Sequence, residues 1–214
     1  MSTASINKKV IFLDWNGTLS NSFFWEHMRN SQNQAVKGLY ERWDHALFTK
    51  SKDYIQNWMR GRNTTESVLK DIAKETATEY ENILAEFVKG CQSMAFVSPK
   101  VPEIITNLRH KGFYIVIATN NMDCFDRWTV PSMRLDKVFD EILNSYYLKG
   151  LKHDENDIGE SLFFKEFFAH RDVLPRDCVF IDDGIDKNGY ISSLGMKYLQ
   201  IQNTNHFLDI LESF

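Results

Sequence analysis

Five short apolar runs most strongly constrain the fold of this chain. Each is rich in Ile, Val, Phe or Tyr and leads into polar or glycine-containing sequence. The runs cover residues 10–13, 113–118, 141–143 with an apolar residue at 139, 178–181 and 197–201. Such runs are typical of strands that are buried on both faces, as in a parallel sheet.

Helical patterns separate the later runs. Residues 102–110 carry apolar side chains at helical spacing and are followed by Gly112, a typical helix stop. Residues 158–169 and 206–211 are predicted as two further helices. Strands that alternate with helices predict an α/β fold, a Rossmann-like doubly wound parallel sheet.

One long region interrupts this alternation. Residues 21–95 show helical periodicity and no strand pattern, and Asn63 followed by Glu66 resembles a capping box. We therefore predict an inserted all-helical domain at 21–95, with the remainder, 1–20 and 96–214, forming the core. The aromatic and basic residues of the insert are expected in its own core and at a solvated edge: Phe23, Phe24, Trp25, Trp43, Trp58, Arg60 and Arg62. The alternative is that they form an aromatic, basic lid that grips an anionic substrate with a flat apolar part.

Charge and composition exclude several classes of partner. The net charge is −4, which indicates neither nucleic-acid binding nor attraction to an anionic membrane. No apolar stretch reaches the roughly 18 residues of a membrane span, and residues 1–9 do not resemble a leader. The three cysteines are widely spaced and form no CxxC pair, which is typical of reduced thiols. We predict a soluble cytoplasmic protein, with its oligomeric state left open.

Polar residues gather where the predicted strands end. Because the carboxyl ends of parallel strands share one edge of the sheet, these residues are expected to meet in one crevice. They are Asp14 after the first strand, Thr119 and Asn120 after the second, Lys149 or Lys152 after the third, and Asp182, Asp183 and Asp186 after the fourth.

This set of residues favours phosphoryl transfer. A carboxylate can attack phosphorus and hold it as an acyl phosphate. Mg²⁺ prefers hard oxygen ligands and can bridge carboxylates and phosphate oxygens. A hydroxyl and an ammonium group can bind the remaining phosphate oxygens. The predicted cofactor is therefore Mg²⁺, and the predicted partner is a small phosphorylated molecule.

Four segments, in order, resemble the motifs of the haloacid dehalogenase superfamily. They are "FLDWNGTLS", "IVIATNN", a lysine in "LKGLKHD" and "VFIDDGIDKNG". Most members of this superfamily are Mg²⁺-dependent phosphatases, and the resemblance covers both ends of the chain. It implies that the helical insert is a type 1 cap, a lid that selects the substrate.

The resemblance also implies roles for individual residues. Asp14 would be the nucleophile, with Thr18 in support, and the metal would be bound by Asp183, Asp182, Asp14 and the backbone carbonyl of Asn16. Thr119, Asn120 and a lysine would bind the phosphate. Lys152 fits the lysine motif better than Lys149, because Ser145 and Asp154 flank it at the family's spacing. Asp186 would orient its neighbours or a metal-bound water.

Asn16 departs from the phosphatase pattern, in which a second aspartate acts as general acid and base. An amide cannot exchange a proton at neutral pH, and such catalysis is typically worth about 10²- to 10⁴-fold. The expected function is an impaired Mg²⁺-dependent phosphatase or phosphotransferase. The amide is compatible with an engineered change, a degenerate enzyme, a substrate with a good leaving group, or another proton donor.

Other functions on similar sheets fit less well. Receiver domains carry their acid pair early and their lysine last, whereas Asp182 and Asp183 come last here. No GxGxxG follows the first strand, which disfavours a dinucleotide enzyme. Dehalogenases of the superfamily also lack the second aspartate but need no metal, and the acid pair disfavours them. The main alternative is a degenerate phosphate-binding or regulatory protein on the same fold.

Overall fold

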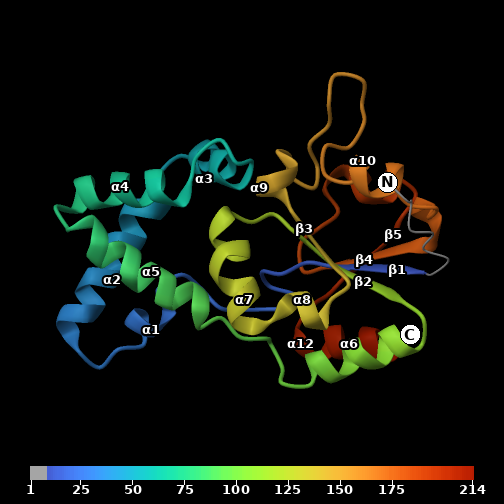
Figure 1. Cartoon of the computed structure of the whole chain (residues 1–214), viewed down its shortest axis with the longest axis horizontal. Helices are drawn as coiled ribbons and strands as arrows, with labels where there is room; N and C mark the ends of the chain where they lie inside the picture. The colour runs from blue at the N-terminus through green and yellow to red at the C-terminus, as the bar shows by residue number, and fades with distance from the viewer. Residues whose placement is uncertain (1–8) are drawn as a thin grey trace.

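The computed structural model describes residues 9–214, so the expectation about residues 1–8 lies outside the described part. A five-stranded sheet in the order β3-β2-β1-β4-β5 forms its centre, and every neighbouring pair is parallel (Figure 1). The strands are β1 (Val10–Leu13), β2 (Tyr114–Thr119), β3 (Glu141–Asn144), β4 (Cys178–Asp182) and β5 (Lys197–Gln200). The predicted Rossmann-like parallel sheet is confirmed.

Both faces of the sheet are covered, as its apolar strands require. Ile11 and Leu13 point to one face, whereas Val10 and Phe12 point to the other. The first face packs on α6 (Val101–His110), α8 (Leu135–Val138) and α12 (Thr204–Glu212). The second packs on α10 (Lys165–Ala169) and α11 (Tyr190–Ser193). These two layers of side chains fix β1 as the buried central strand.

One predicted helix is wrong over most of its length. Of residues 158–169, only α10 at the end is helical. The Asn156 side chain accepts hydrogen bonds from the backbone amides of Ile158 and Glu160, at 3.1 and 2.9 Å, and Gly159 has a φ of +78°. These contacts form a turn instead of a helix start. The turn projects from the molecule as a loop, and Ile158 on it is 78% exposed (Figure 1).

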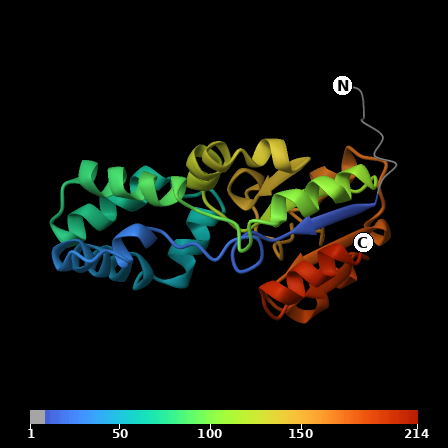
Figure 2. The same cartoon turned by 90° about the horizontal axis from the view of Figure 1, so that it is seen from below.

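Residues 21–95 contain helices and no strand. The helices are α1 (Glu26–Arg29), α2 (Gln34–Phe48), α3 (Lys52–Met59), α4 (Thr65–Thr76) and α5 (Tyr80–Gln92). Trp25, Trp43 and Trp58 are fully buried in a second hydrophobic cluster, which also includes Met122 and Cys124 from the segment after β2. Figures 1 and 2 both show this helical insert beside the sheet along the long axis of the molecule.

The start of α4 differs from the predicted capping box. Thr64, not Asn63, is the N-cap, and Ser67 takes the place expected for Glu66. The side chain of Thr64 accepts from the Ser67 amide, while the Ser67 hydroxyl accepts from the Thr64 amide. The same reciprocal chemistry therefore operates one residue later along the chain.

Several short segments complete the core. They are η1 (Phe125–Thr129), α7 (Val130–Met133), α9 (Ser145–Leu148), η2 (Pro175–Asp177) and η3 (Lys187–Gly189). η1 is a π-helix that continues directly into α7, and it packs beside α5. It thus connects the loop after β2 to the helical insert.

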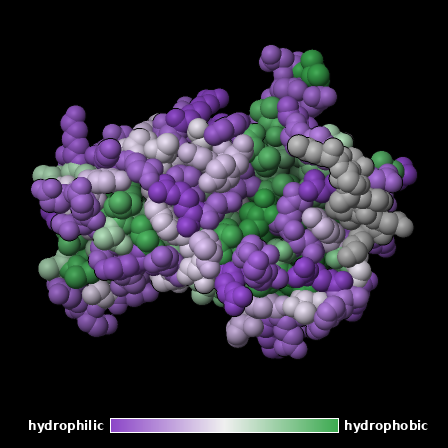
Figure 3. All heavy atoms as spheres, in the orientation of Figure 1, coloured by the Kyte–Doolittle hydropathy of each residue, from purple (hydrophilic) through white to green (hydrophobic). Residues whose placement is uncertain are grey.

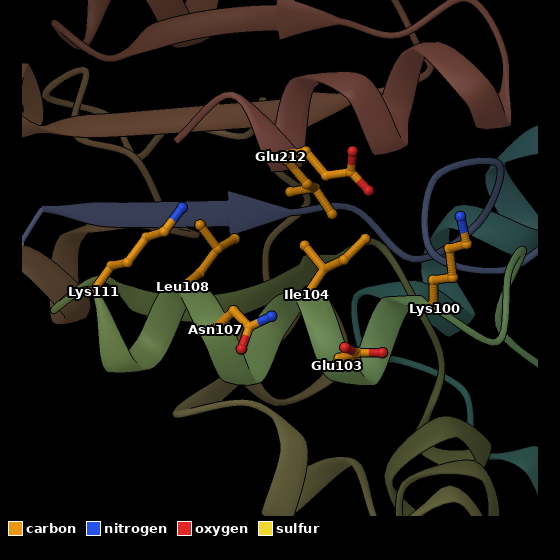
Figure 4. A pocket seen from close by; sticks show the side chains of 8 residues that line it. Lys100, Glu103, Ile104, Asn107, Leu108, Lys111 and Glu212 are labelled. Carbon is orange, nitrogen blue, oxygen red and sulfur yellow. The ribbon is translucent and has the colours of Figure 1, made fainter.

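The outer surface is mainly hydrophilic. On the face drawn in Figure 3, hydrophobic atoms gather over the insert and in the middle of that face. A hollow of about 380 Å³ lies between α6 and α12 and carries charges of both signs (Figure 4). Its charged side chains are Lys100, Glu103, Lys111 and Glu212. Within residues 9–214, no helix combines the length and apolar character that crossing a membrane requires.

Candidate active site

Asp14 directly follows the central strand. Its backbone amide donates to the Ile181 carbonyl at 3.0 Å, which extends the pairing of β1 with β4 by one residue. The residue is 8% exposed. A carboxylate is thus held at the carboxyl edge of the sheet, where α/β proteins bind their ligands.

Lys152 lies between two carboxylates. Its ammonium is 2.9 Å from Asp14 Oδ1 and 2.7 Å from Asp182 Oδ2, and the residue is 4% exposed. Lys149 lies elsewhere, with its ammonium 3.3 Å from the Gly61 carbonyl and 4.7 Å from the ring centroid of Tyr146. Of the two candidate lysines, the structure therefore brings Lys152 into the site.

Burial controls the protonation of this cluster. Burial raises the pKa of Asp14 to about 6, because the attraction of Lys152 offsets only part of the desolvation and Asp182 adds repulsion. Burial by itself lowers the pKa of Lys152, but the two carboxylates outweigh it and the pKa is raised overall. The ammonium consequently stays charged while Asp14 titrates near neutral pH.

Asp183 is exposed at the mouth of the site and is fixed through its backbone. Its amide donates to the buried Thr18 hydroxyl at 3.0 Å. Its carboxylate lies directly against Gly17, whose φ is +81°. Since a Cβ at position 17 would overlap that carboxylate, glycine is needed both for the backbone turn and for this approach.

Three carboxylates could together hold a divalent cation. One oxygen each of Asp14, Asp182 and Asp183 lies within 4.8 Å of the others. Asp182 also accepts from the Gly184 amide at 2.7 Å, which orients it toward the cluster. Hard oxygen donors of this kind fit Mg²⁺, which binds through a few carboxylates and retains waters and phosphate oxygens.

The end of β2 supplies two polar side chains with different surroundings. Thr119 is fully buried, and its hydroxyl has no hydrogen-bond partner within residues 9–214. Asn120 instead accepts from the Lys152 backbone amide at 2.9 Å. Asn120 therefore supports the lysine loop, while Thr119 keeps a free hydroxyl, which buried polar groups seldom do.

Asn16 and Asp186 occupy different positions relative to the cluster. Asn16 is exposed and lines a cavity of about 720 Å³ together with Asn120 and Asp183. Asp186 lies outside the carboxylate cluster, and its side chain accepts from the amides of Ile191 and Ser192 at 2.8 and 3.0 Å. It thereby caps the turn into α11.

The structure also reveals an ion pair that the sequence motifs do not show. Asp154 accepts from the Leu151 amide at 2.8 Å and pairs with Arg60 of the insert at 2.6 and 2.8 Å. A second neighbouring arginine, Arg62, bonds to Asn57 at 3.0 Å. The spacing of Asp154 from Lys152 pointed to the acid, whereas Arg60 lies too far along the chain for any spacing to indicate it.

A buried carboxylate after β2 was also missed. Asp123 accepts from Trp58 Nε1 at 3.0 Å and the Thr65 hydroxyl at 2.7 Å, and it pairs with Arg127 at 2.9 Å. Its position in the polar segment after β2 was the only sequence signal. It joins the strand that carries Thr119 to α3 and α4 of the insert.

A curated relative resembles half of this chain. It is a component of an NADH-quinone oxidoreductase from Rhizobium meliloti (strain 1021), 28% identical over 107 residues. That match covers 50% of this chain, and the chain spans 12% of the relative's length.

Solved structures share the fold. A haloacid dehalogenase family enzyme from Bacteroides thetaiotaomicron, in complex with magnesium and inorganic phosphate, superposes with a TM-score of 0.60 at 16% identity, covering 92% of this chain and 95% of that chain. The L-2-haloacid dehalogenase of Xanthobacter autotrophicus, with chloropropionic acid covalently bound, gives a TM-score of 0.59 at 14% identity, covering 96% and 83%.

The profile of haloacid dehalogenase-like hydrolases matches residues 11–185, a range that includes the insert, the first three motifs and the fourth as far as Ile185. This chain belongs to the haloacid dehalogenase-like hydrolase family.

Proposed function

We propose that this chain is a Mg²⁺-dependent phosphatase or phosphotransferase that takes a phosphoryl group onto Asp14. The observation that carries the proposal is the contact of Asp14 and Asp182 with one buried ammonium, beside a third carboxylate. A bound Mg²⁺ would neutralise the acids and the phosphate oxygens. The Thr119 hydroxyl is the buried donor that a phosphate oxygen would satisfy.

In the first step, a carboxylate oxygen of Asp14 attacks phosphorus. A bond from oxygen to phosphorus forms, the ester bond breaks, and the alcohol oxygen leaves with the electron pair and needs a proton. Lys152 keeps Asp14 oriented and partly neutralises the charge that gathers around phosphorus. In the second step water attacks phosphorus, releasing inorganic phosphate and the Asp14 carboxylate.

Asn16 handicaps both steps, because its amide neither gives nor takes a proton at neutral pH. Asn16 lines the cavity together with Asp183, and in this proposal the leaving group lies in that cavity. Good leaving groups need little help in the first step, whereas the second step always needs a base for water. The phosphorylated form of Asp14 is therefore expected to accumulate.

The remaining parts of the proposal concern the insert and the setting. Residues 21–95 would act as the cap over the site formed by 1–20 and 96–214, and a small phosphorylated molecule would bind between them. We place the protein in the cytoplasm, consistent with three free, buried cysteines. Asn16 also supports the alternative, a protein that binds phosphate without turnover.

The test uses p-nitrophenyl phosphate with Mg²⁺. We expect a burst of nitrophenol of about one per chain, followed by slow turnover, and mass spectrometry should find the phosphate on Asp14. Asn16→Asp should raise steady turnover by about a hundredfold or more, and Asp14→Ala should abolish both phases. Bound Mg²⁺ with neither a burst in the protein nor steady turnover in Asn16→Asp would support the binding protein instead.

A further inference from the structure

The cavity beside the catalytic carboxylates is much larger than a phosphate group. At about 720 Å³ it falls within the range of pockets that enclose drug-sized ligands. It runs from Asn16 and Asp183 into the helical insert. A phosphate bound at the carboxylates would therefore leave most of the cavity for the organic part of a substrate.

The wall formed by the insert is apolar and aromatic. Its side chains include Phe23, Phe24, Tyr40, Phe48 and Met59. Phe23 and Phe48 are 58% and 56% exposed, which is unusual for phenylalanine, a residue that contributes about 1.5–3 kcal/mol when it is fully buried. An apolar ligand body would cover these rings.

Arg29 is the one cation among the residues that line this cavity. It ends α1, is exposed, and lies with its guanidinium 5.8 Å from the ring centroid of Phe23. Within residues 9–214 it forms no ion pair, whereas Arg60 is paired with Asp154. Its five donors are therefore available to a ligand.

From this arrangement we infer that the substrate is a phosphate monoester with an apolar body that carries one carboxylate away from the phosphate. The inference rests on the proposed function and names its substrate class. The apolar body would lie on the phenylalanine wall, and the carboxylate would receive paired hydrogen bonds from Arg29. The other charged residues of the lining, Asp44 and Asp183, are carboxylates, so Arg29 is the one partner that the lining offers to a carboxylate.

Three phosphonates measure separately what the phosphate group, the apolar body and the carboxylate contribute to binding. Phosphonates are used because they bind without being cleaved. They are methylphosphonate, which has no body, 4-(2-carbamoylethyl)benzylphosphonate, which has a neutral body, and the corresponding carboxylic acid. Each competes with p-nitrophenyl phosphate in the Mg²⁺-dependent burst. We expect inhibition to strengthen in that order, by about tenfold at each step.

Arg29→Gln should make the carboxylic acid bind no more tightly than the amide. Arg42→Gln is the matched control, since Arg42 is an exposed arginine on α2 that does not line the cavity, and it should keep the advantage of the acid over the amide. An arginine that only rests on Phe23 would leave the ratio unchanged on substitution.

Three results would overturn the inference while leaving the proposed function intact. The first is that methylphosphonate binds as tightly as the larger ligands. The second is that the acid and the amide bind equally tightly. The third is that Arg29→Gln weakens the binding of all three phosphonates by the same factor. The last result would assign Arg29 to the transferred phosphate. The absence of any burst with p-nitrophenyl phosphate would instead refute the proposed function, and the inference with it.

Discussion

At the scale of single residues, the buried Thr119 hydroxyl distinguishes a binding role from a structural role. An unpaired buried polar group costs about 1–3 kcal/mol, so its removal should stabilise the fold. We expect Thr119→Val to raise the free energy of unfolding by about 1 kcal/mol and to weaken phosphate binding about tenfold. Urea denaturation and phosphate titration with Mg²⁺ measure the two effects.

Thr129 provides the matched control for this substitution. It is equally buried, but its hydroxyl donates to the Cys91 carbonyl at 2.9 Å. Thr129→Val should therefore destabilise the protein, by about 1 kcal/mol, and leave phosphate binding unchanged. If both substitutions destabilise the protein equally, Thr119 has a hidden structural partner and its predicted role in phosphate binding is wrong.

The raised pKa of Asp14 predicts how stability changes with pH in metal-free protein. Burial raises this pKa to about 6 from an ordinary value of 3.8, so the folded state holds the proton more tightly than the unfolded chain does. The tighter binding of this proton adds fully to the free energy of unfolding below the ordinary pKa, and the addition is lost as the pH rises through about 6. Asp14→Asn should therefore gain stability relative to the parent between about pH 4 and pH 7.

Chemical denaturation at several pH values in EDTA tests this prediction. Added Mg²⁺ should reduce the difference at pH 7, because a cation stabilises the ionised carboxylate. Parallel stability curves for the parent and Asp14→Asn, with no divergence around pH 6, would contradict the assignment of burial as the dominant cause.

At the scale of elements, the ion pair of Arg60 with Asp154 connects the end of α3 to the loop that carries Lys152. Asp154 also fixes this loop by accepting from the Leu151 amide at 2.8 Å. We expect Asp154→Asn to lower the free energy of unfolding by about 1 kcal/mol, because the pair is partly exposed. The same substitution should slow phosphorylation of Asp14 about tenfold, because the loop that positions Lys152 is less well fixed. The burst rate measures the effect on the reaction.

Arg62→Gln is the control for the loss of a charge at this position. Within residues 9–214 the exposed Arg62 side chain bonds only to the Asn57 side chain, so its substitution should change neither stability nor the burst rate. Arg60→Gln should reproduce the effect of Asp154→Asn. Equal burst rates in all three variants would show that Lys152 keeps its position without the pair.

The elements also show which parts of the fold are predictable from sequence. All five strands lie within one residue of their predicted bounds, because strands buried on both faces need continuous apolar runs. The helix predicted at 158–169 is wrong because apolar spacing carried more weight in the prediction than the turn formed by Asn156 and Gly159. Local hydrogen bonds of Asn and Gly compete with helices, and periodicity does not register them.

The candidate site was predictable where it depends on the ends of strands. Asp14, Thr119 and Asp182 lie where parallel pairing brings them together. Contacts between distant segments were not predictable: Arg60 with Asp154, and Arg29 within the cavity. These pairings depend on how the insert packs against the core, and no spacing along one chain encodes that packing.

At the scale of the whole molecule, polar contacts join the insert to the core on two sides. Where the chain enters and leaves the insert, the Ser20 hydroxyl donates to the Ala95 carbonyl at 2.7 Å and the Val97 amide donates to the Leu19 carbonyl at 2.9 Å. On the other side, Asp123 accepts from Trp58 and Thr65. We therefore expect insert and core to unfold in one cooperative step.

Asp123→Asn should break this cooperativity. The substitution removes a buried negative charge that pairs with Arg127 and accepts three hydrogen bonds from the insert. We expect the free energy of unfolding to fall by about 3 kcal/mol. Three of the five tryptophans lie in the insert, at positions 25, 43 and 58, so fluorescence mainly reports its unfolding. Hydrogen exchange of the amides in β1 and β2 reports the sheet.

In the parent, the fluorescence transition and the opening of the sheet should coincide. In Asp123→Asn, the fluorescence transition should come first, because the buried charge that binds α3 and α4 to the segment after β2 is lost. Glu66→Gln is the control: it removes only the exposed partner of Arg127, and it should cost less than about 1 kcal/mol without separating the transitions. Coincident transitions in Asp123→Asn would mean that the other contacts, which include the serine bonds, the Arg60 pair and the packing of η1 beside α5, suffice to couple insert and sheet, and that the cap proposed for this site moves with the core as one body.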